Sequence, residues 1–589
     1  MHPRRTWLPL VGAALLGLFS LSPATGSAAE HAAATSTATP IQHLVVIFQE
    51  NVSFDHYFAT YPEAANTDGQ PFKDIGHVVV NNLANTKGAG GVGNLLTNNP
   101  NAANPRRYDP TNINDILTCD QNHNYDSEQK AFDNGKMDLF VQTVGTGSGK
   151  SNTGQPCNAA DVMNYYDGNT VTAFWNYAQQ FAMSDNSFDT TFGPSSPGAV
   201  NLISGNTGGI GLSINQPPVP FGIVSDGKGG LTLIGDSQPY FDDCSTRDAV
   251  SLTGKNIGDL LNAAGLSWGW FQGGNRPTTQ FATAAAAVGH PGQPTSTFIP
   301  DEFNKKFNVP PQANQGICNA VHPVGVAVGG VGQYGYKDDY IPHHEPFDYY
   351  ASTANPHHLA PTSVATIGTD TQTFANGVPQ FDTANHQYDV SDFDSLVAAI
   401  SRGYLSPDHL PAVSFLKASG YQDGHAGYSD PLDEQQFVVN EINALQHTPD
   451  WASTAVVIAY DDSDGWYDHA FSGVHNPSAT ALDFLTGTAQ CGTGTALAGE
   501  QGRCGYGPRQ PLLLISPFAR ENKVDHTLTD LSSILKFAED NWSLGTIDGS
   551  FDSMAGSLNG MFDFKGERGD NSKKLFLDPI TGQPVRAES

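Results

Sequence analysis

Four oxygen-bearing side chains lie where two apolar runs of the sequence end. Glu50 and Asn51 follow one continuous apolar run, and Asp461 and Asp462 follow another. Carboxylate and amide oxygens are the ligands that hard divalent cations prefer. Because carboxylates repel one another, the four groups can lie together only where a cation offsets their charge. The sequence therefore predicts one divalent metal ion bound by these residues; the alternative is that each pair merely ends its own strand.

A serine in a Gly/Pro turn is the candidate nucleophile. Ser195 lies in the segment 193–198, GPSSPG, and the apolar residues 199–203 after it could begin a helix. Backbone N–H groups and the positive end of a helix favour an anion such as phosphate. A serine beside a divalent cation loses its proton readily enough to attack phosphorus. We predict that Ser195 forms a phosphoseryl intermediate; Ser196 is the local competitor, and a plain turn or N-cap serine is the alternative.

Four of the 19 histidines lie in loops where they could contact a phosphate: His123, His343, His344 and His425. Imidazoles in such places bind phosphoryl oxygens as cations or protonate a leaving group. The alternative is a histidine that caps a turn. An unperturbed histidine is charged below about pH 6.5, so we expect the activity to peak between roughly pH 5 and 7.

Alternating strand and helix patterns must position these side chains. Five short apolar runs are typical of buried strands: 43–48, 266–270, 412–416, 454–459 and 511–515. Four stretches carry apolar residues at helical spacing: 159–182, 389–402, 432–446 and 528–543. This order predicts an α/β fold with a mainly parallel sheet flanked by helices, interrupted by loop-rich insertions such as 85–106 and 275–335. In such sheets ligands bind at the carboxyl ends of the strands.

The composition excludes several classes of protein. Apolar residues make up 39% of the 589, which is too many for a disordered protein. Charged residues are only 15%, whereas Gly 62 and Pro 38 indicate a loop-rich chain. With 28 Lys+Arg against 59 Asp+Glu the formal charge is −31, which repels polyphosphate backbones. We therefore expect no nucleic-acid partner.

The first residues are typical of an export signal. Arg4 and Arg5 precede the apolar run 7–21, which is too short to span a bilayer. We predict a signal peptide at 1–29, a disordered lead-in at 30–40, and a secreted or periplasmic protein with no stable membrane anchor. The pair of arginines resembles a twin-arginine signal, and an ordinary basic segment is the alternative.

Six cysteines in an exported chain predict disulfides. None of them has the C-x-x-C spacing of a metal site. We expect Cys491 to pair with Cys504 and Cys119 to pair with Cys157.

Several motifs together resemble a known family. The segment 41–58, IQHLVVIFQENVSFDHYF, resembles the opening motif of the bacterial phosphoesterase family, which contains phosphocholine-preferring phospholipases C and acid phosphatases of the AcpA type. Val52 departs from the family, where arginine is commoner at a position that is not a ligand. Further motifs follow in the family order: 135–138 (GKMD), 193–197 (GPSSP), 460–469 (YDDSDGWYDH) and 531–542 (LSSILKFAEDNW).

This resemblance implies an alkaline-phosphatase-like α/β fold and a single catalytic domain over 41–589. It assigns the same side chains as the chemistry does: metal binding to Glu50, Asn51, Asp461 and Asp462, the nucleophile to Ser195, and the phosphate pocket to His123, His343, His344 and His425.

The choice between the two branches rests on smaller features. Many phospholipase members have threonine where this chain has Ser195, and the larger ones carry β-rich repeats after the catalytic domain, whereas this sequence ends about 45 residues past Trp542. We therefore predict a secreted acid phosphatase that hydrolyses small phosphomonoesters. The alternatives are a phospholipase C that cleaves phosphatidylcholine-type diesters, and a secreted binding protein that keeps the fold without activity.

Overall fold

The computed structural model describes residues 37–76, 78–214, 222–276, 320–330, 332–565 and 573–585. Every element described below belongs to one compact unit, residues 36–589. The predicted signal peptide at 1–29 and much of the predicted insertion at 275–335 lie outside the described residues. Residues 37–40 of the predicted lead-in are attached to the domain, since Ala38 and Thr39 donate hydrogen bonds to Asn541.

An eight-stranded sheet forms the centre of the unit, in the order β14-β9-β15-β1-β16-β17-β2-β18. All five predicted runs are strands of this sheet: β1 His43–Gln49, β9 Trp268–Gln272, β15 Val413–Lys417, β16 Thr454–Tyr460 and β17 Leu512–Ile515. Three short strands complete it: β2 Ala182–Ser184, β14 Gln387–Asp389 and β18 Lys523–Asp525. The pairs from β14 to β16 are parallel, whereas β17 runs antiparallel to β16 and β2. The prediction of a mainly parallel sheet is confirmed.

The apolar sequence of β1 explains its position at the centre of the sheet. All seven residues of β1 are buried, and Val45, Val46 and Ile47 are fully inaccessible to solvent. A strand that is apolar at every position suits a parallel sheet, because helices cover both faces. Its neighbours β15 and β16 are equally buried.

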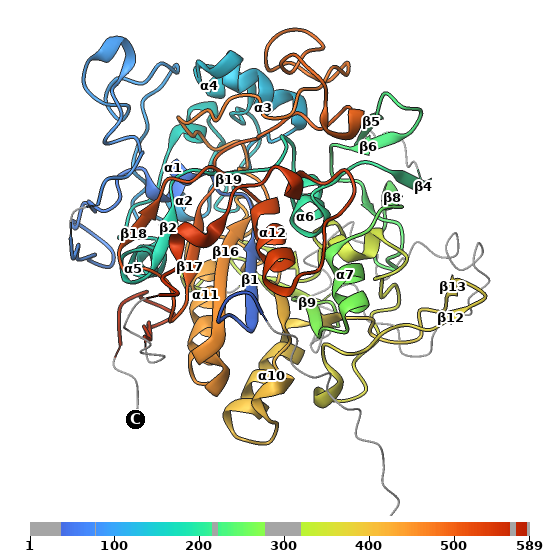
Figure 1. Ribbon diagram of the computed structural model, residues 1–589. Coiled ribbons are helices and arrows are strands. Elements are labelled where there is room, and N and C mark those ends of the chain that lie inside the picture. The colour runs from blue at the N-terminus through green and yellow to red at the C-terminus, as the bar shows by residue number, and fades with distance from the viewer. Residues whose placement is uncertain are drawn as a thin grey trace, which may run out of the picture. The chain divides into compact units, whose positions relative to one another are not determined.

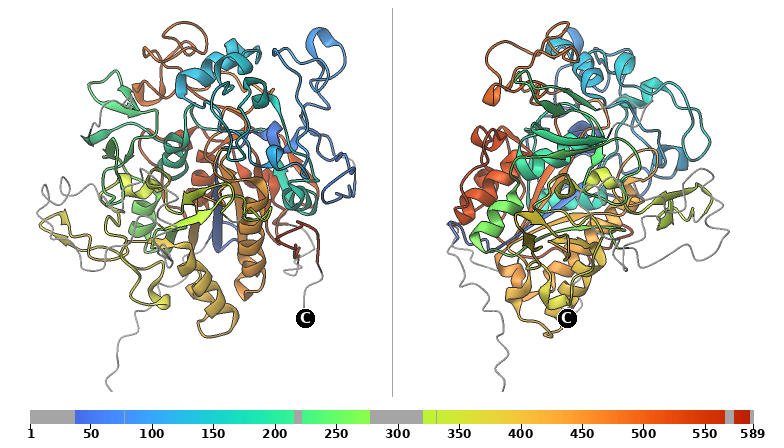
Figure 2. Two further views of the ribbon diagram at one scale, coloured as in Figure 1. Left: turned by 180° about the vertical axis from the view of Figure 1, so that it is seen from behind. Right: turned by 90° about the vertical axis from the view of Figure 1, so that its right-hand side faces the viewer.

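Helices cover the two faces of the sheet: α5 Thr172–Gln180, α6 Ser195–Ser204, α7 Ile257–Ala264, α10 Val390–Ser401, α11 Pro431–Gln446 and α12 Ser532–Trp542. Figure 1 shows α6, α7 and α12 in front of the sheet, and Figure 2 shows α11 on the opposite face. The predicted helices at 389–402, 432–446 and 528–543 are confirmed. The stretch 159–182 instead forms a 3₁₀ turn at Ala159–Met163 and then α5, because the turn-forming residues 167–169, DGN, interrupt it.

The remaining elements are short and lie in the connecting segments. Four short helices occur near the N-terminal half: α1 Phe54–Phe58, α2 Ile113–Ile116, α3 Tyr125–Phe132 and α4 Phe140–Thr143. Small two- and three-stranded sheets contain β3 Ser187–Phe188, β4 Ile210–Ile214, β5 Ile223–Ser225, β6 Leu231–Leu233, β7 Gln238–Pro239, β8 Ala249–Leu252, β10 Val321–Pro323, β11 Tyr336–Asp338, β12 Phe374–Ala375, β13 Val378–Pro379 and β19 Thr529–Asp530. The loop-rich character predicted from Gly and Pro is confirmed.

Disulfides fasten two of these segments. Cys119 is bonded to Cys157 and Cys491 to Cys504, as predicted, and Cys244 is also disulfide-bonded. Among the described residues, no helix has the length and apolar character needed to cross a bilayer.

Candidate functional site

The two acidic strand ends lie side by side. β1 and β16 are parallel neighbours in register, with Gln49 opposite Tyr460, so the residues that follow them emerge at the same edge of the sheet. The backbone N–H of Asn51 donates to Oδ1 of Asp461 at 3.0 Å. The structure thus brings together two predicted ligand pairs that are 410 residues apart in sequence.

Ser195 faces these carboxylates from the first turn of α6. Its Oγ donates to Oε2 of Glu50 and to Oδ2 of Asp462, both at 3.1 Å. Two glycines permit this approach. Gly193 has a φ of +123°, and a Cβ on Gly198 would lie 2.0 Å from the backbone O of Asp461. The helix therefore presents its N-terminal N–H groups beside a hydroxyl held by two carboxylates.

Ser196 has different surroundings. Its backbone N–H and its Oγ both donate to Oδ1 of Asp236, at 3.0 and 3.1 Å, and the hydroxyl of Tyr349 donates to its Oγ. This serine anchors the turn, and only Ser195 of the pair is bonded to the acidic cluster.

The acidic cluster fits a hard divalent cation. Glu50, Asn51, Asp461 and Asp462 are all fully buried. Oδ1 of Asn51 and Oδ2 of Asp461 are buried with no hydrogen-bond partner among the described residues, so both offer lone pairs to a ligand. Burial, and then the charge of Asp461, raise the pKa of Glu50 and of Asp462 well above the usual range. A bound cation would offset this repulsion and desolvation.

Lys417, at the end of β15, is a member of the site that the sequence analysis missed. Its buried ammonium contacts Oε1 of Glu50, and Nδ1 of His344 lies 3.3 Å from the same oxygen. Burial alone would raise the pKa of Asp461, but Lys417, together with hydrogen bonds from Glu50 and from the backbone N–H groups of Asn51 and Asp462, lowers it. Lys417 directly follows the run 412–416, so the rule that selected Glu50 and Asp461 also applies to it.

His123 lies beside the cluster from the segment before α3. Its Nδ1 is 3.0 Å from Oδ1 of Asp464, which also accepts from Nδ2 of Asn51 at 3.3 Å. Burial would lower the pKa of His123, but the carboxylates of Asp462 and Asp464 raise it well above its usual value.

The other three predicted histidines also line this region, but they differ in charge from our expectation. Burial lowers the pKa of His343 to about 3 and that of His425 to about 4, and it lowers the pKa of His344 well below its usual value. We expected all three to be cations between pH 5 and 7. The expectation treated them as exposed imidazoles, whereas burial disfavours the charged form. The prediction of an acid optimum is therefore wrong in so far as it depended on these three histidines being charged.

Two further basic residues lie near these histidines. Nη2 of Arg247 is 3.3 Å from Nδ1 of His343 and donates to the backbone O of Asp236. Nζ of Lys337, on β11, lies 3.6 Å above the ring of Tyr428, and that ring stacks on His425. Neither residue follows a strand of the main sheet or belongs to a motif, so no signal in the sequence indicated that they belong to the site.

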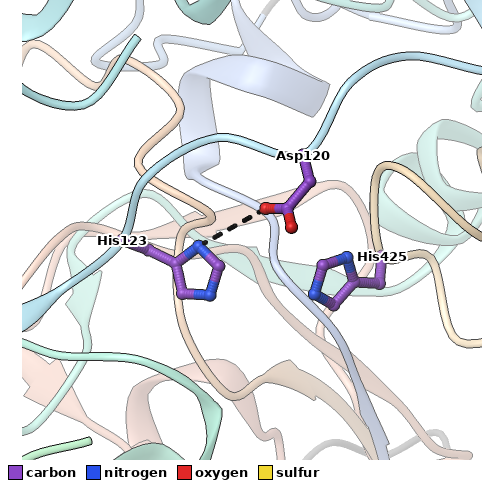
Figure 3. Close-up of side chains that lie close together, drawn as sticks. All are labelled: Asp120, His123 and His425. Carbon is purple, nitrogen blue, oxygen red and sulfur yellow. Dashed lines mark ion pairs between the residues drawn. The ribbon is translucent and has the colours of Figure 1, made fainter. Parts of the chain in front are cut away.

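His123 and His425 come from segments far apart in the chain, and their side chains lie close together (Figure 3). Their ring centroids are 6.0 Å apart, and the carboxylate of Asp120 lies beside them. All nine residues selected from the sequence are thus placed around the carboxyl ends of β1 and β16, and their roles remain predictions.

Comparison with known proteins identifies the family of the chain. The model of the phosphoesterase family matches residues 41–545. A non-hemolytic phospholipase C of Burkholderia pseudomallei is 22% identical over 520 residues, covering 86% of this chain and 55% of the relative. A hemolytic phospholipase C of Pseudomonas aeruginosa is 22% identical over 607 aligned residues, covering 99% of this chain and 65% of the relative.

A shorter match, 28% identical over 125 residues, is to phospholipase C A of Mycobacterium tuberculosis; it covers 20% of this chain and 24% of the relative. The chain spans a little over half to just under two thirds of the length of the two longer matches. The family model covers most of the chain and begins at the residue where the sequence predicted the domain to begin. The chain belongs to the phosphoesterase family.

Proposed function

We propose that this protein hydrolyses phosphate esters with Ser195 as the nucleophile. One observation carries the proposal: Oγ of Ser195, at the N-terminus of α6, donates to Glu50 and Asp462 within a buried acidic cluster. Each of the two carboxylates lies at hydrogen-bond distance from the hydroxyl, so either is positioned to take up the serine proton. The serine oxygen then attacks phosphorus at the helix N-terminus, where N–H groups stabilise the phosphoryl oxygens.

The reaction has two halves. In the first, the Oγ–P bond forms, the P–O bond to the alcohol breaks, and the leaving oxygen takes up a proton. In the second, water attacks the phosphoseryl group, which restores the serine hydroxyl and releases the phosphate product. Arg247 and Lys337 provide positive charge near His343 and His425. They favour an anionic substrate over a neutral one.

The metal ion belongs to the same proposal. Glu50, Asn51, Asp461 and Asp462 would hold one divalent cation, and the orphaned oxygens of Asn51 and Asp461 support this set. When bound, the cation would lower the pKa of the Ser195 hydroxyl and neutralise charge on the phosphoryl group.

The substrate class is chosen from the relatives. The sequence favoured a phosphomonoester, but the relatives from B. pseudomallei and P. aeruginosa are both named phospholipase C. We therefore place a phospholipid diester first and a small phosphomonoester second. Both present a tetrahedral phosphate to Ser195. A binding protein without activity is disfavoured, because the nucleophile and its acceptors are all in place.

Export is also part of the proposal. Two disulfides are typical of an oxidising compartment outside the cytosol. The candidate signal at 1–29 would provide the route, and its arginine pair suits either the twin-arginine pathway or an ordinary export signal. We propose a secreted or periplasmic enzyme.

The test compares two substrates under one set of conditions. Purified protein is assayed on an aryl phosphate and on phosphatidylcholine vesicles, each with and without a chelator of divalent cations. We expect cleavage of at least one substrate, faster turnover of the phospholipid, and loss of activity with chelator that is restored by added metal. Faster turnover of the aryl phosphate would return the choice to an acid phosphatase. Full activity after exhaustive chelation would remove the metal from the mechanism.

A further inference from the structure

A second group of side chains that could hold a metal ion lies next to the acidic cluster. Asp120, His123 and His425 each offer one donor atom, and the three atoms lie within 4.8 Å of one another. Figure 3 shows the carboxylate and the two imidazole rings turned toward the space between them. None of the three belongs to the oxygen cluster of Glu50, Asn51, Asp461 and Asp462.

The hydrogen bonds of the two histidines match those of metal ligands. Nδ1 of His425 donates to the backbone O of Ala426, and Nδ1 of His123 lies 3.0 Å from both the backbone O of Gln121 and Oδ1 of Asp464. In the described part of the chain, neither Nε2 has a hydrogen-bond partner. Metal-ligating histidines characteristically donate one ring N–H to a carbonyl or carboxylate and bind the ion through the other nitrogen.

The segments that carry these residues are fixed in place. The disulfide of Cys119 holds the residue next to Asp120. Gly427 approaches so closely that a Cβ on it would lie 2.9 Å from Cβ of Asp120, and its N–H donates to the backbone O of Thr118. The two loops therefore hold the three ligands without a bound ion, which reduces the cost of ordering them when an ion binds.

The donor set selects the kind of ion. Two imidazole nitrogens and one carboxylate oxygen suit Zn²⁺ or a similar transition metal, whereas the all-oxygen cluster suits a harder cation. Three protein ligands leave a fourth position open, as in exchangeable zinc sites. The side chain of Asp120 is 55% exposed, so this position can be reached from solvent.

We propose that Asp120, His123 and His425 form a second metal site, selective for Zn²⁺-like ions, next to the acidic cluster. A cation there changes the role predicted for the two histidines, because they bind the ion and the ion faces the substrate. The site stands on its own geometry and does not rest on the proposed function.

The test counts zinc ions rather than measuring turnover. Zn²⁺ is titrated calorimetrically into the full chain in excess Mg²⁺, and bound zinc is also measured after equilibrium dialysis. We expect wild type to bind one more Zn²⁺ per chain than Asp120→Asn and than His425→Gln. The variant with both substitutions should bind no fewer zinc ions than either single variant, because the two substitutions remove the same site.

Asp126→Asn is the matched control, since Asp126 is a nearby carboxylate that pairs with Lys130 and faces no histidine. It should bind zinc as wild type does. The thermal midpoint of every variant is measured, and zinc counts are compared only among variants that keep the wild-type midpoint. Because the Asp120 side chain is 55% exposed, Asp120→Asn should keep it. Equal zinc counts in wild type and Asp120→Asn would overturn the site, and so would loss of two ions in the double variant. Inactivity of all variants and wild type would affect only the proposed function.

Discussion

At the scale of single residues, the environment of two adjacent serines decides which one can react. Ser195 donates to two carboxylates with raised pKa, whereas Ser196 is bonded to Asp236 and Tyr349. We expect Ser195→Ala to lower kcat by roughly 10⁴-fold or more, because no other nucleophile takes its place. Ser196→Ala should keep most of the activity.

Acid-quenched wild type should also carry one phosphoryl group on the peptide that contains Ser195, detected by mass spectrometry. Thermal midpoints of both variants serve as controls for folding. Loss of activity in Ser196→Ala with retention in Ser195→Ala would reverse the assignment.

The sequence could predict those residues of the candidate site that come directly after a strand. Glu50, Asn51, Asp461 and Asp462 stand directly after buried runs, and the topology of a parallel sheet brings such positions together. Arg247 and Lys337 could not be found in this way, because they reach the pocket from short peripheral strands and loops whose placement depends on tertiary packing. The charge states of His343 and His425 were unpredictable for a related reason: their burial comes from residues distant in sequence.

At the scale of elements, the fit of α6 against the end of β16 positions the nucleophile. A Cβ on Gly198 would meet the backbone O of Asp461 at 2.0 Å and its carbonyl carbon at 2.6 Å, both rigid parts of the chain. We expect Gly198→Ala to destabilise the protein by roughly 1 to 3 kcal/mol through overpacking. Because the helix must shift, kcat should also fall.

Gly254→Ala is the matched control, since a Cβ there has open space around it. Urea unfolding and steady-state kinetics of the two variants provide the measurement. A Gly198→Ala protein with wild-type stability and kcat would show that α6 does not need this close approach.

The elements themselves were predictable to different degrees. Long continuous runs such as 43–48 and 454–459 were found because parallel strands must be apolar at every position. The reversed direction of β17 was not, since periodicity carries no information on strand direction. β2 and β18, at three residues each, are too short to give a pattern. Helix α6 begins at Ser195 itself, several residues before the apolar stretch that indicated it.

At the scale of the whole molecule, buried neutral histidines make stability depend on pH. His386 stacks on Trp268, and its Nδ1 donates to the backbone O of the same residue. Burial lowers its pKa to about 4 from an ordinary value of 6.5. Between these two pH values the unfolded chain binds a proton that the folded chain does not, so stability falls as the pH falls.

The contribution of His386 is complete above pH 6.5 and is lost by about pH 4, a change of about 3 kcal/mol. His386→Asn removes this titration, and asparagine tolerates the φ of +69° at this position. Urea unfolding of both proteins at several pH values should show a steeper loss in wild type across that window. Parallel pH profiles would mean that His386 titrates normally in the folded protein.

The pairing of β1 with strands from the far end of the chain has a consequence for biosynthesis. The hydrogen bond between Asn51 and Asp461 can form only after Asp461, which lies 410 residues later in the chain, has been synthesised. At a translation rate of roughly 5 to 20 residues per second, that interval lasts about 20 to 80 seconds. For most of that time the central strand has left the ribosome while its neighbours β15 and β16 have not yet been synthesised, so its apolar residues cannot be buried between them. The proposed active site is incomplete over the same interval, because Asp462, one of the two carboxylates that accept from Ser195, is synthesised only in the last quarter of the chain.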